Sequence, residues 1–246
     1  MMVAGQPLLL KLPLLAAMAG GVSIAFTSPQ PPPSRKETGE YEDGAPEPVK
    51  GLHSWGAAAV RFIPRSAQLI ESALILYKVF PVLRDIPLPT WIRPSLSTFA
   101  QVDNLRITPS FVVGTALICL GAYVRTLCFR TLGPQFTFQL SIKEDHRLVT
   151  DGPYSVVRHP AYGGGVIQLI GMLACLGGPG SWFREIGVYS TSGRVAGATA
   201  FAMLFLCLFG AIARTYPEDV VLRKTFKEEW DEYVRRTPYR IIPYVY

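Results

Sequence analysis

Charged residues are scarce in this sequence, and they are absent from three long stretches. Asp, Glu, Lys and Arg make up 17% of the 246 residues, hydrophobic residues make up 49%, and the mean hydropathy is positive. The uncharged stretches are residues 107–124, 159–183 and 195–213. A helix of roughly 20 apolar residues crosses the hydrocarbon core of a bilayer, which is about 30 Å thick. Three such stretches would leave a soluble domain with too little polar surface, so we expect an all-α, multi-span helical membrane protein.

Cysteine is also scarce, and its spacing argues against a metal site. The four cysteines are Cys119, Cys128, Cys175 and Cys207. They lie in or beside apolar stretches, and no CxxC pair occurs among them. Structural zinc sites and disulfide frameworks usually depend on closely and regularly spaced cysteines. We therefore expect these cysteines to be packing residues, with no metal bound.

Basic residues exceed acidic ones, but they do not form a nucleic-acid surface. The formal net charge is +6, and the Lys and Arg residues bracket apolar stretches instead of lining one stripe. Residues 160–182 and 195–213 are predicted to form a helical hairpin, so residues 143–159 and 214–246 emerge on the same side of the membrane. Those two flanking segments contain ten Lys or Arg residues, whereas the hairpin loop contains two. The positive-inside rule places both segments in the cytosol, and no nucleic-acid partner is expected.

The first hundred residues divide into three parts. Residues 1–28 contain an apolar stretch after Lys11, which fits a first span or a signal anchor, and the lack of a clear cleavage site favours a retained anchor. Residues 29–52 are rich in proline and charge, and they are predicted to be a flexible loop. Residues 53–106 contain a helix interrupted by four charges, which is a possible span, and an interfacial loop. Together with the three uncharged stretches, this organisation makes about five spans.

Two charged blocks flank the predicted hairpin. The first, HRLVTDGPYSVVRHPAYGGG, begins at His146, and the second, RTYPEDVVLRKTFKEEWDEYVRRTPYRIIP, begins at Arg214. Apolar residues recur every four positions in the second block, at Leu222, Phe226, Trp230 and Val234. This period predicts a single helix with one apolar stripe, which Pro238 would end.

In their order and spacing, the two blocks resemble the motifs of the isoprenylcysteine carboxyl methyltransferase family. The resemblance covers about residues 107–246, and the first hundred residues add nothing to it. It implies a methyltransferase core whose blocks fold over each other on the cytosolic side, with the C-terminal helix covering a pocket for S-adenosylmethionine. It also implies methyl transfer to the C-terminal carboxylate of a prenylated cysteine, in the endoplasmic reticulum if the source is eukaryotic. The partners to expect are prenylated protein C-termini or a lipophilic small acceptor, and membrane lipids.

The resemblance also implies site residues, position by position. Those that would line the cofactor are His146, Leu148, Val149, Tyr154, Arg158, His159, Tyr162 and Glu218. Arg214 precedes Glu218 by four residues, as in the family, so both would lie on one helix face as the expected catalytic pair, with Arg214 holding the acceptor. The residue types suit these roles. Aromatic faces attract a sulfonium, Glu218 suits an ammonium or ribose hydroxyls, and Arg158 and His159 can donate to a carboxylate.

The acceptor chemistry accounts for the lack of an obvious acid–base dyad. A terminal carboxylate, with a reference pKa of about 3.5, is already ionised at neutral pH. It needs alignment and exclusion of water rather than a general base, whereas an amine must first lose a proton. The second block departs from the family pattern at Asp219, where a second Glu is common, and it has Pro217 between Arg214 and Glu218. A proline there requires a helix start or a kink.

Some alternatives stay open on the sequence alone. The same fold could methylate a phospholipid amine or another lipophilic acceptor, and a catalytically silent membrane scaffold is a third possibility. The joint presence of Tyr154, His159, Tyr162 and Glu218 argues against the silent scaffold. The three glycines at 163–165 make room either for the cofactor or for a neighbouring helix.

Overall fold

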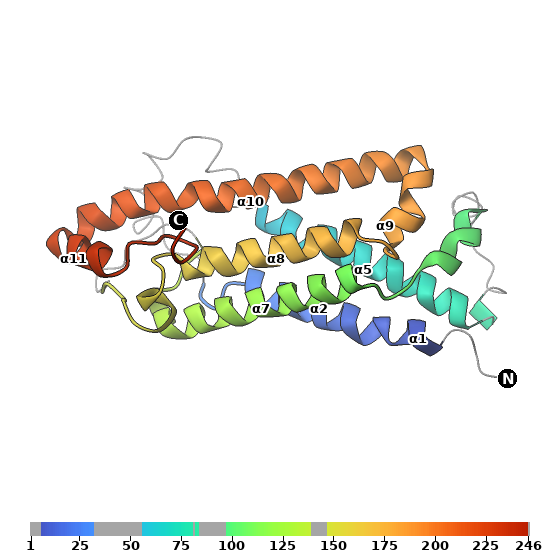
Figure 1. Cartoon of the computed structure of the whole chain (residues 1–246), viewed down its shortest axis with the longest axis horizontal. Coiled ribbons are helices and arrows are strands. Elements are labelled where there is room, and N and C mark those ends of the chain that lie inside the picture. Colours follow the sequence, from blue (N-terminus) through green and yellow to red (C-terminus); the bar gives the residue numbers. More distant parts are fainter. Residues whose placement is uncertain (1–5, 32–55, 81, 84–96, 139–146, 246) are drawn as a thin grey trace.

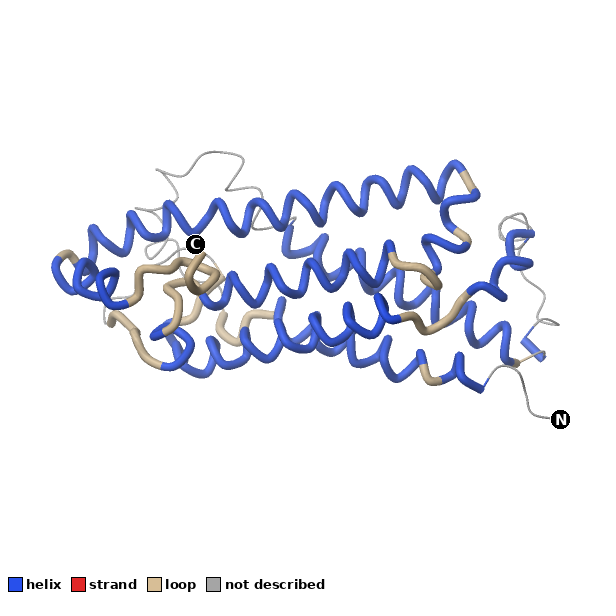
Figure 2. The backbone as a smooth tube through the Cα atoms, in the orientation of Figure 1, coloured by secondary structure: helices blue, strands red, loops and turns tan. Residues whose placement is uncertain are grey.

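The regular elements of the described chain are helical. The computed structural model describes residues 6–31, 56–80, 82–83, 97–138 and 147–245. Within these ranges the regular elements are α-helices and 3-10 helices, which form an elongated bundle (Figures 1 and 2). The all-α prediction is therefore confirmed. Most of the predicted loop 29–52 and His146 lie outside the described residues.

Three helices in the described residues are long and apolar enough to cross a membrane. They are α7 (Pro109–Leu132), α8 (Pro160–Gly177) and α10 (Thr191–Phe226). The apolar helix α2 (Lys11–Phe26) has only 16 residues, which is about 24 Å of helix. Helix α5 (Ala57–Val79) has 23 residues and carries charges along its length. The chain is thus an integral membrane protein, and the crossing by α2 and α5 that would make five spans stays a prediction.

Local sequence determines where the long helices begin. The hydroxyl of Thr108 accepts a hydrogen bond from the backbone N–H of Phe111 at 3.3 Å, and the hydroxyl of Ser190 does the same for Gly193 at 3.0 Å. Such caps satisfy N–H groups that have no partner inside the helix. Helix α8 begins at Pro160, whose fixed φ suits a first helical turn. The first block therefore leads directly into α8.

Glycines allow α7 and α8 to pack closely. A Cβ placed on Gly171 of α8 would lie 2.6 Å from the carbonyl oxygen of Gly114 in α7, and a Cβ on Gly114 would lie 2.8 Å from the carbonyl oxygen of Gly171. Any side chain at either position would force the backbones apart. Small residues at facing positions are the usual way in which membrane helices come into contact.

Lys11, the first residue of α2, is buried inside the bundle. Its side chain is 0% exposed and forms an ion pair with Glu71 of α5. Its ammonium also donates to the carbonyl oxygens of Arg106 at 3.0 Å and Gly180 at 2.8 Å. A buried charge requires such partners, because the lost hydration is otherwise uncompensated. Lys11 thus joins the N-terminal helix to α5 and to the end of the α7–α8 pair.

The second block forms two helices, which corrects the prediction of one helix with one stripe. Helix α10 continues through Pro217 to Phe226, and α11 (Glu228–Arg236) follows after Lys227, whose φ is +49°. The break allows α11 to fold back, so that the Tyr233 hydroxyl donates to the carbonyl oxygen of Tyr154 at 2.7 Å. The four-residue period continues across the break, because a spacing of apolar residues does not reveal a change of backbone direction at one residue.

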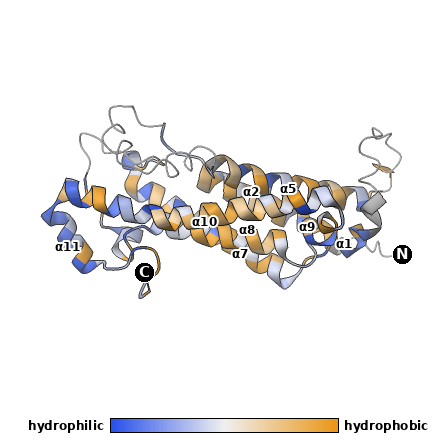
Figure 3. Cartoon of the chain, turned by 90° about the horizontal axis from the view of Figure 1, so that it is seen from above, coloured by the Kyte–Doolittle hydropathy of each residue, from blue (hydrophilic) through white to orange (hydrophobic). Residues whose placement is uncertain are grey.

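Polar and apolar residues separate along the bundle. Figure 3 shows apolar residues along α7, α8 and α10, and hydrophilic residues gathered around α11. The polar end contains the first block, α11 and the C-terminal segment (Figure 1). Lys11 and Glu71 lie towards the other end, near Gly180.

Candidate active site

A cavity of about 270 Å³ lies beside α11 at the polar end of the bundle. Residues from α2, α5, α7, α8, α10 and α11 line it, together with the segment after α7. The predicted site residues among them are Leu148, Val149, Tyr154, Arg158, His159, Tyr162, Arg214 and Glu218. The structure thus brings together eight of the nine predicted residues, and the ninth, His146, lies outside the described residues.

Backbone hydrogen bonds join the two blocks. The N–H of Arg158 donates to the carbonyl oxygen of Tyr239 at 2.9 Å, and the N–H of His159 donates to that of Arg240 at 2.7 Å. The Arg158 guanidinium adds bonds to the carbonyl oxygens of Thr237 at 3.0 Å and Pro238 at 2.7 Å. The C-terminal segment is therefore held against the start of α8.

Asp219 is the charged centre of this junction. Its carboxylate accepts hydrogen bonds from Arg158 Nη2 at 3.1 Å and Arg240 Nε at 2.8 Å, and it lies 2.6 Å from His159 Nε2. All four residues are buried or partly buried. The residue that departs from the family pattern thus orients Arg158 and His159, both of which were predicted to contact the cofactor.

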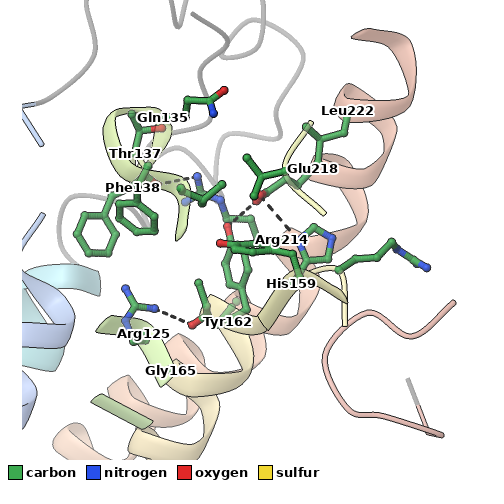
Figure 4. A pocket seen from close by; sticks show the side chains of 18 of the residues that line it. Arg125, Gln135, Thr137, Phe138, His159, Tyr162, Gly165, Arg214, Glu218 and Leu222 are labelled. Carbon is green, nitrogen blue, oxygen red and sulfur yellow. Dashed lines mark hydrogen bonds and ion pairs between the residues drawn. The ribbon is translucent and has the colours of Figure 1, made fainter. Parts of the chain in front are cut away.

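Tyr162 and Glu218 link the first turn of α8 to α10 inside the cavity (Figure 4). The Tyr162 hydroxyl donates to Glu218 Oε2 at 2.7 Å, and His159 Nδ1 lies 3.8 Å from Glu218 Oε1. One turn earlier on α10, Arg214 donates to the carbonyl oxygen of Phe138 at 2.7 Å, and its guanidinium lies 6.0 Å from the centre of the Tyr162 ring. Helix α10 keeps Arg214 and Glu218 on one face although Pro217 intervenes.

Two phenols close the cavity from the loop and from α11. Tyr154 lies in a 3-10 turn (Gly152–Ser155), and Tyr233 lies in α11. Burial raises the pKa of both phenols, that of Tyr154 well above its ordinary value. Both therefore remain neutral at physiological pH, and Tyr233 keeps the proton that it donates to the carbonyl oxygen of Tyr154.

Sequence comparison finds similarity to one protein family. The model of the isoprenylcysteine carboxyl methyltransferase (ICMT) family matches residues 113–183, which include most of α7, the first block and α8. Protein-S-isoprenylcysteine O-methyltransferase B of Arabidopsis thaliana is 32% identical over 127 residues, which are 51% of this chain and 55% of that protein. Over these regions the chain is similar to the isoprenylcysteine carboxyl methyltransferase family.

The relatives of this chain have names that point to different roles. The protein-S-isoprenylcysteine O-methyltransferase of Schizosaccharomyces pombe is 36% identical over 92 residues, which are 32% of this chain and 39% of that protein. The cobalt-zinc-cadmium resistance protein CzcN of Cupriavidus metallidurans is 30% identical over 149 residues, which are 61% of this chain and 50% of that protein. The chain spans about half the length of the curated relatives it matches. Similarity to this family therefore leaves the acceptor to be argued from the site.

The three glycines of the first block have separate surroundings. A Cβ on Gly163 would lie 3.3 Å from the carbonyl oxygen of Ile241, and a Cβ on Gly164 would lie 2.9 Å from that of Gly121 in α7. Gly165 lines the cavity, where a Cβ would lie 3.4 Å from Arg125 Nη1. Helix packing therefore explains Gly164, the close C-terminal segment explains Gly163, and only Gly165 makes room at the cavity.

Arg125 and residues of the N-terminal helices also line the cavity, which the sequence did not indicate. Arg125 follows the uncharged stretch 107–124, but α7 continues past it and its side chain is buried. Phe26 of α2 and Val60 of α5 come from the part of the chain that adds nothing to the family resemblance. The sequence did contain one signal for Arg125. It is a charged residue directly after the apolar stretch 107–124 and shortly before Phe129, and charges inside membrane helices often have functional roles. For Phe26 and Val60 the sequence contained no signal, because apolar residues are common throughout these helices.

Proposed function

We propose that this protein transfers a methyl group from S-adenosylmethionine to the C-terminal carboxylate of a prenylated cysteine, at the cytosolic face of the endoplasmic reticulum membrane. The observation that carries the proposal is that polar residues of both blocks and apolar residues of the membrane helices line one cavity. Similarity to the isoprenylcysteine carboxyl methyltransferase family supports it.

The cavity offers both kinds of wall that a prenylated cysteine requires. Its polar part includes Arg214 and Glu218, and its apolar part includes Val60 of α5, Leu169 of α8 and Cys207 of α10. A prenyl chain can pass from the bilayer to an apolar wall without being exposed to water, while the carboxylate reaches the polar groups.

The residues present fit S-adenosylmethionine, which supplies an electrophilic methyl group on a sulfonium when bound. The aromatic rings of Tyr154 and Tyr162 suit the sulfonium, Glu218 suits the ammonium or the ribose hydroxyls, and Leu148 and Val149 offer an apolar surface. Gly165 leaves space beside Tyr162 because it has no side chain. Arg158 and His159 would hold the cofactor carboxylate in the orientation that Asp219 imposes on them.

The protein's own contribution is to align the reactants and to exclude water. An ionised carboxylate needs no general base, so an arginine of the cavity would hold it and the cavity walls would orient it. Trp230 and Tyr233 of α11 line the cavity and are 3% and 2% exposed. They would cover the reacting groups from the cytosolic side.

The charges favour a carboxylate acceptor over an amine. Among the described residues that line the cavity, four are arginines and one, Glu218, is a carboxylate. Asp219 neutralises only Arg158 of these four, through the 3.1 Å ion pair. A cationic surplus attracts a carboxylate and repels the ammonium of a phospholipid headgroup.

A labelled methyl group distinguishes the possible functions. Protein purified in detergent would receive labelled S-adenosylmethionine with either a farnesylcysteine analogue or phosphatidylethanolamine. We expect a base-labile methyl ester on the farnesylcysteine analogue. Label found only on phosphatidylethanolamine would favour the amine alternative, and protein that binds no cofactor would be the silent scaffold.

Glu218 is expected to contribute to cofactor affinity. The Glu218→Gln variant removes a charged hydrogen-bond acceptor, which is worth about 1.5–3 kcal/mol, so cofactor binding should weaken roughly tenfold or more by calorimetry. The exposed Glu232 of α11 supplies the matched control, Glu232→Gln. Equal affinities in wild type and Glu218→Gln would remove Glu218 from the cofactor site.

A further inference from the structure

Arg125 is a buried cation in the wall of the cavity. Its residue is 6% exposed, and it lies on α7 two turns before the end of that helix. Its Nε donates to the carbonyl oxygen of Ala25 at 2.8 Å, and its Nη1 donates to that of Ala161 at 2.9 Å. The side chain thus reaches across the bundle from α7 to the end of α2 and to the start of α8.

No carboxylate of the described residues lies within 4.0 Å of this guanidinium. Three rings surround it instead, with centroids 4.9 Å (Phe26), 5.4 Å (Phe129) and 5.4 Å (Phe138) from its central carbon. Aromatic faces offset part of the cost of burying a cation, but they do not neutralise it. Its Nη2 makes no hydrogen bond within the described residues.

Arg125 and Glu218 approach opposite ends of Tyr162. Glu218 accepts from the hydroxyl, whereas Arg125 binds the carbonyl oxygen of Ala161, next to the Tyr162 backbone (Figure 4). The cavity therefore has a carboxylate towards its loop end and a permanently charged guanidinium towards the membrane helices. A cationic cofactor group and an anionic acceptor group would be attracted to different ends.

We propose that Arg125, and not the Arg214 that the family resemblance implies, binds the carboxylate of the methyl acceptor and makes the enzyme selective for an ionised acceptor. This assignment rests on the proposed carboxyl methylation. Its neighbours Ala25 and Phe26 belong to the apolar helix α2, and Gly165 belongs to α8, so Arg125 faces the side of the cavity that an apolar acceptor chain would occupy. A guanidinium donates N–H groups in one plane to a carboxylate. In Arg125 the Nε and Nη1 atoms already donate to backbone carbonyl oxygens, so Nη2 is the nitrogen that can donate to the acceptor.

The same charge favours release of the product. The acceptor carries one negative charge before the reaction and none afterwards, because the methyl group caps one carboxylate oxygen. The attraction to Arg125 is therefore strong for the acceptor and weak for the ester. A group that binds the reactant through its charge discriminates against every neutral analogue of the same shape.

The experiment measures the affinity of a farnesylcysteine carboxylate and of its carboxamide, both in the presence of saturating S-adenosylhomocysteine. We expect the wild type to prefer the carboxylate roughly 10- to 100-fold, the usual range for a charged hydrogen bond. In Arg125→Gln the ratio should fall close to one, and in Arg125→Lys it should be intermediate. The exposed Arg130 on the same helix provides the control, Arg130→Gln, which should keep the wild-type ratio.

Each outcome has a distinct meaning. A ratio of two affinities does not depend on the fraction of folded protein, so Arg125→Gln remains informative if it is less stable, and Arg125→Lys retains the charge if the Gln variant cannot be purified. A wild-type ratio in Arg125→Gln overturns the assignment, as does a loss of S-adenosylhomocysteine affinity with the ratio unchanged, which would assign Arg125 to the cofactor carboxylate. Wild-type protein that binds S-adenosylhomocysteine but neither acceptor analogue would overturn the proposed function itself.

Discussion

At the scale of single residues, Asp219 does most to assemble the site. It contacts two guanidinium groups and one imidazole, which come from both blocks. The family pattern commonly has a Glu at this position, and an Asp has a shorter side chain. In the structure the shorter side chain is held directly against Arg158 and His159, so its carboxylate positions the residues predicted to bind the cofactor.

Asp219→Asn should destabilise the protein. Removal of the negative charge leaves Arg158, whose side chain is 6% exposed, without its counter-ion, and breaking a buried pair in this way costs about 3–5 kcal/mol. Thermal unfolding in detergent would detect this loss. Asp231→Asn is the control, because Asp231 pairs with Arg223 on the surface, at 49% and 68% exposure, and such pairs contribute about 0–1 kcal/mol. Similar effects of the two substitutions would mean that the Asp219 junction is not a buried ionic centre.

At the scale of helices, the break between α10 and α11 determines whether the cavity is covered. Trp230 and Tyr233 line the cavity because α11 folds back after Lys227. Had α10 continued, these residues would have extended away from the first block. One residue with a positive φ therefore allows α11 to form a wall of the cavity.

Lys227→Gly should stabilise the protein. The backbone of Lys227 has φ +49° and ψ −115°, a conformation that costs a residue with a side chain about 1–3 kcal/mol and that glycine adopts readily. We expect an increase in stability of about 1 kcal/mol in thermal unfolding, and a decrease for the β-branched variant Lys227→Val. A loss of stability in the glycine variant would show that the helix break does not depend on this backbone conformation.

At the scale of the whole molecule, the N-terminal helix is attached at both ends of the bundle. Lys11 binds Glu71, Arg106 and Gly180 at one end, and Arg125 binds the carbonyl oxygen of Ala25 at the other. Helix α2 is therefore packed as an integral part of the bundle that supports the cavity. The part of the chain outside the family resemblance contributes both to the fold and to the site.

Lys11→Met should be destabilising, and Lys11→Met with Glu71→Gln should be much less so. The single substitution leaves the carboxylate of Glu71, 8% exposed, without a cation, at a cost of about 3 kcal/mol or more. The second substitution removes that charge and keeps an acceptor for the N–H of Trp182, which now donates to Glu71 at 3.3 Å. Unfolding of the two variants in detergent would test the pair. If the double variant is no more stable than the single one, Lys11 does not act through Glu71.

The features that the sequence determined by itself are those encoded in composition, period and motif order. Uncharged stretches require a membrane and predict α7, α8 and α10, because only helices of that length satisfy their backbone within lipid. The two blocks carry the family resemblance, and the hairpin between them predicts that Tyr162 and Glu218 lie on the same side of the membrane. The tertiary structure alone determined which charges are buried and which residues face them. Lys11 pairs with Glu71, Asp219 joins two guanidinium groups and an imidazole, and Arg125 enters the cavity. These contacts depend on how helices that are far apart in the sequence pack against each other. A buried charge is tolerated only where that packing supplies a partner of opposite charge or hydrogen-bonding groups.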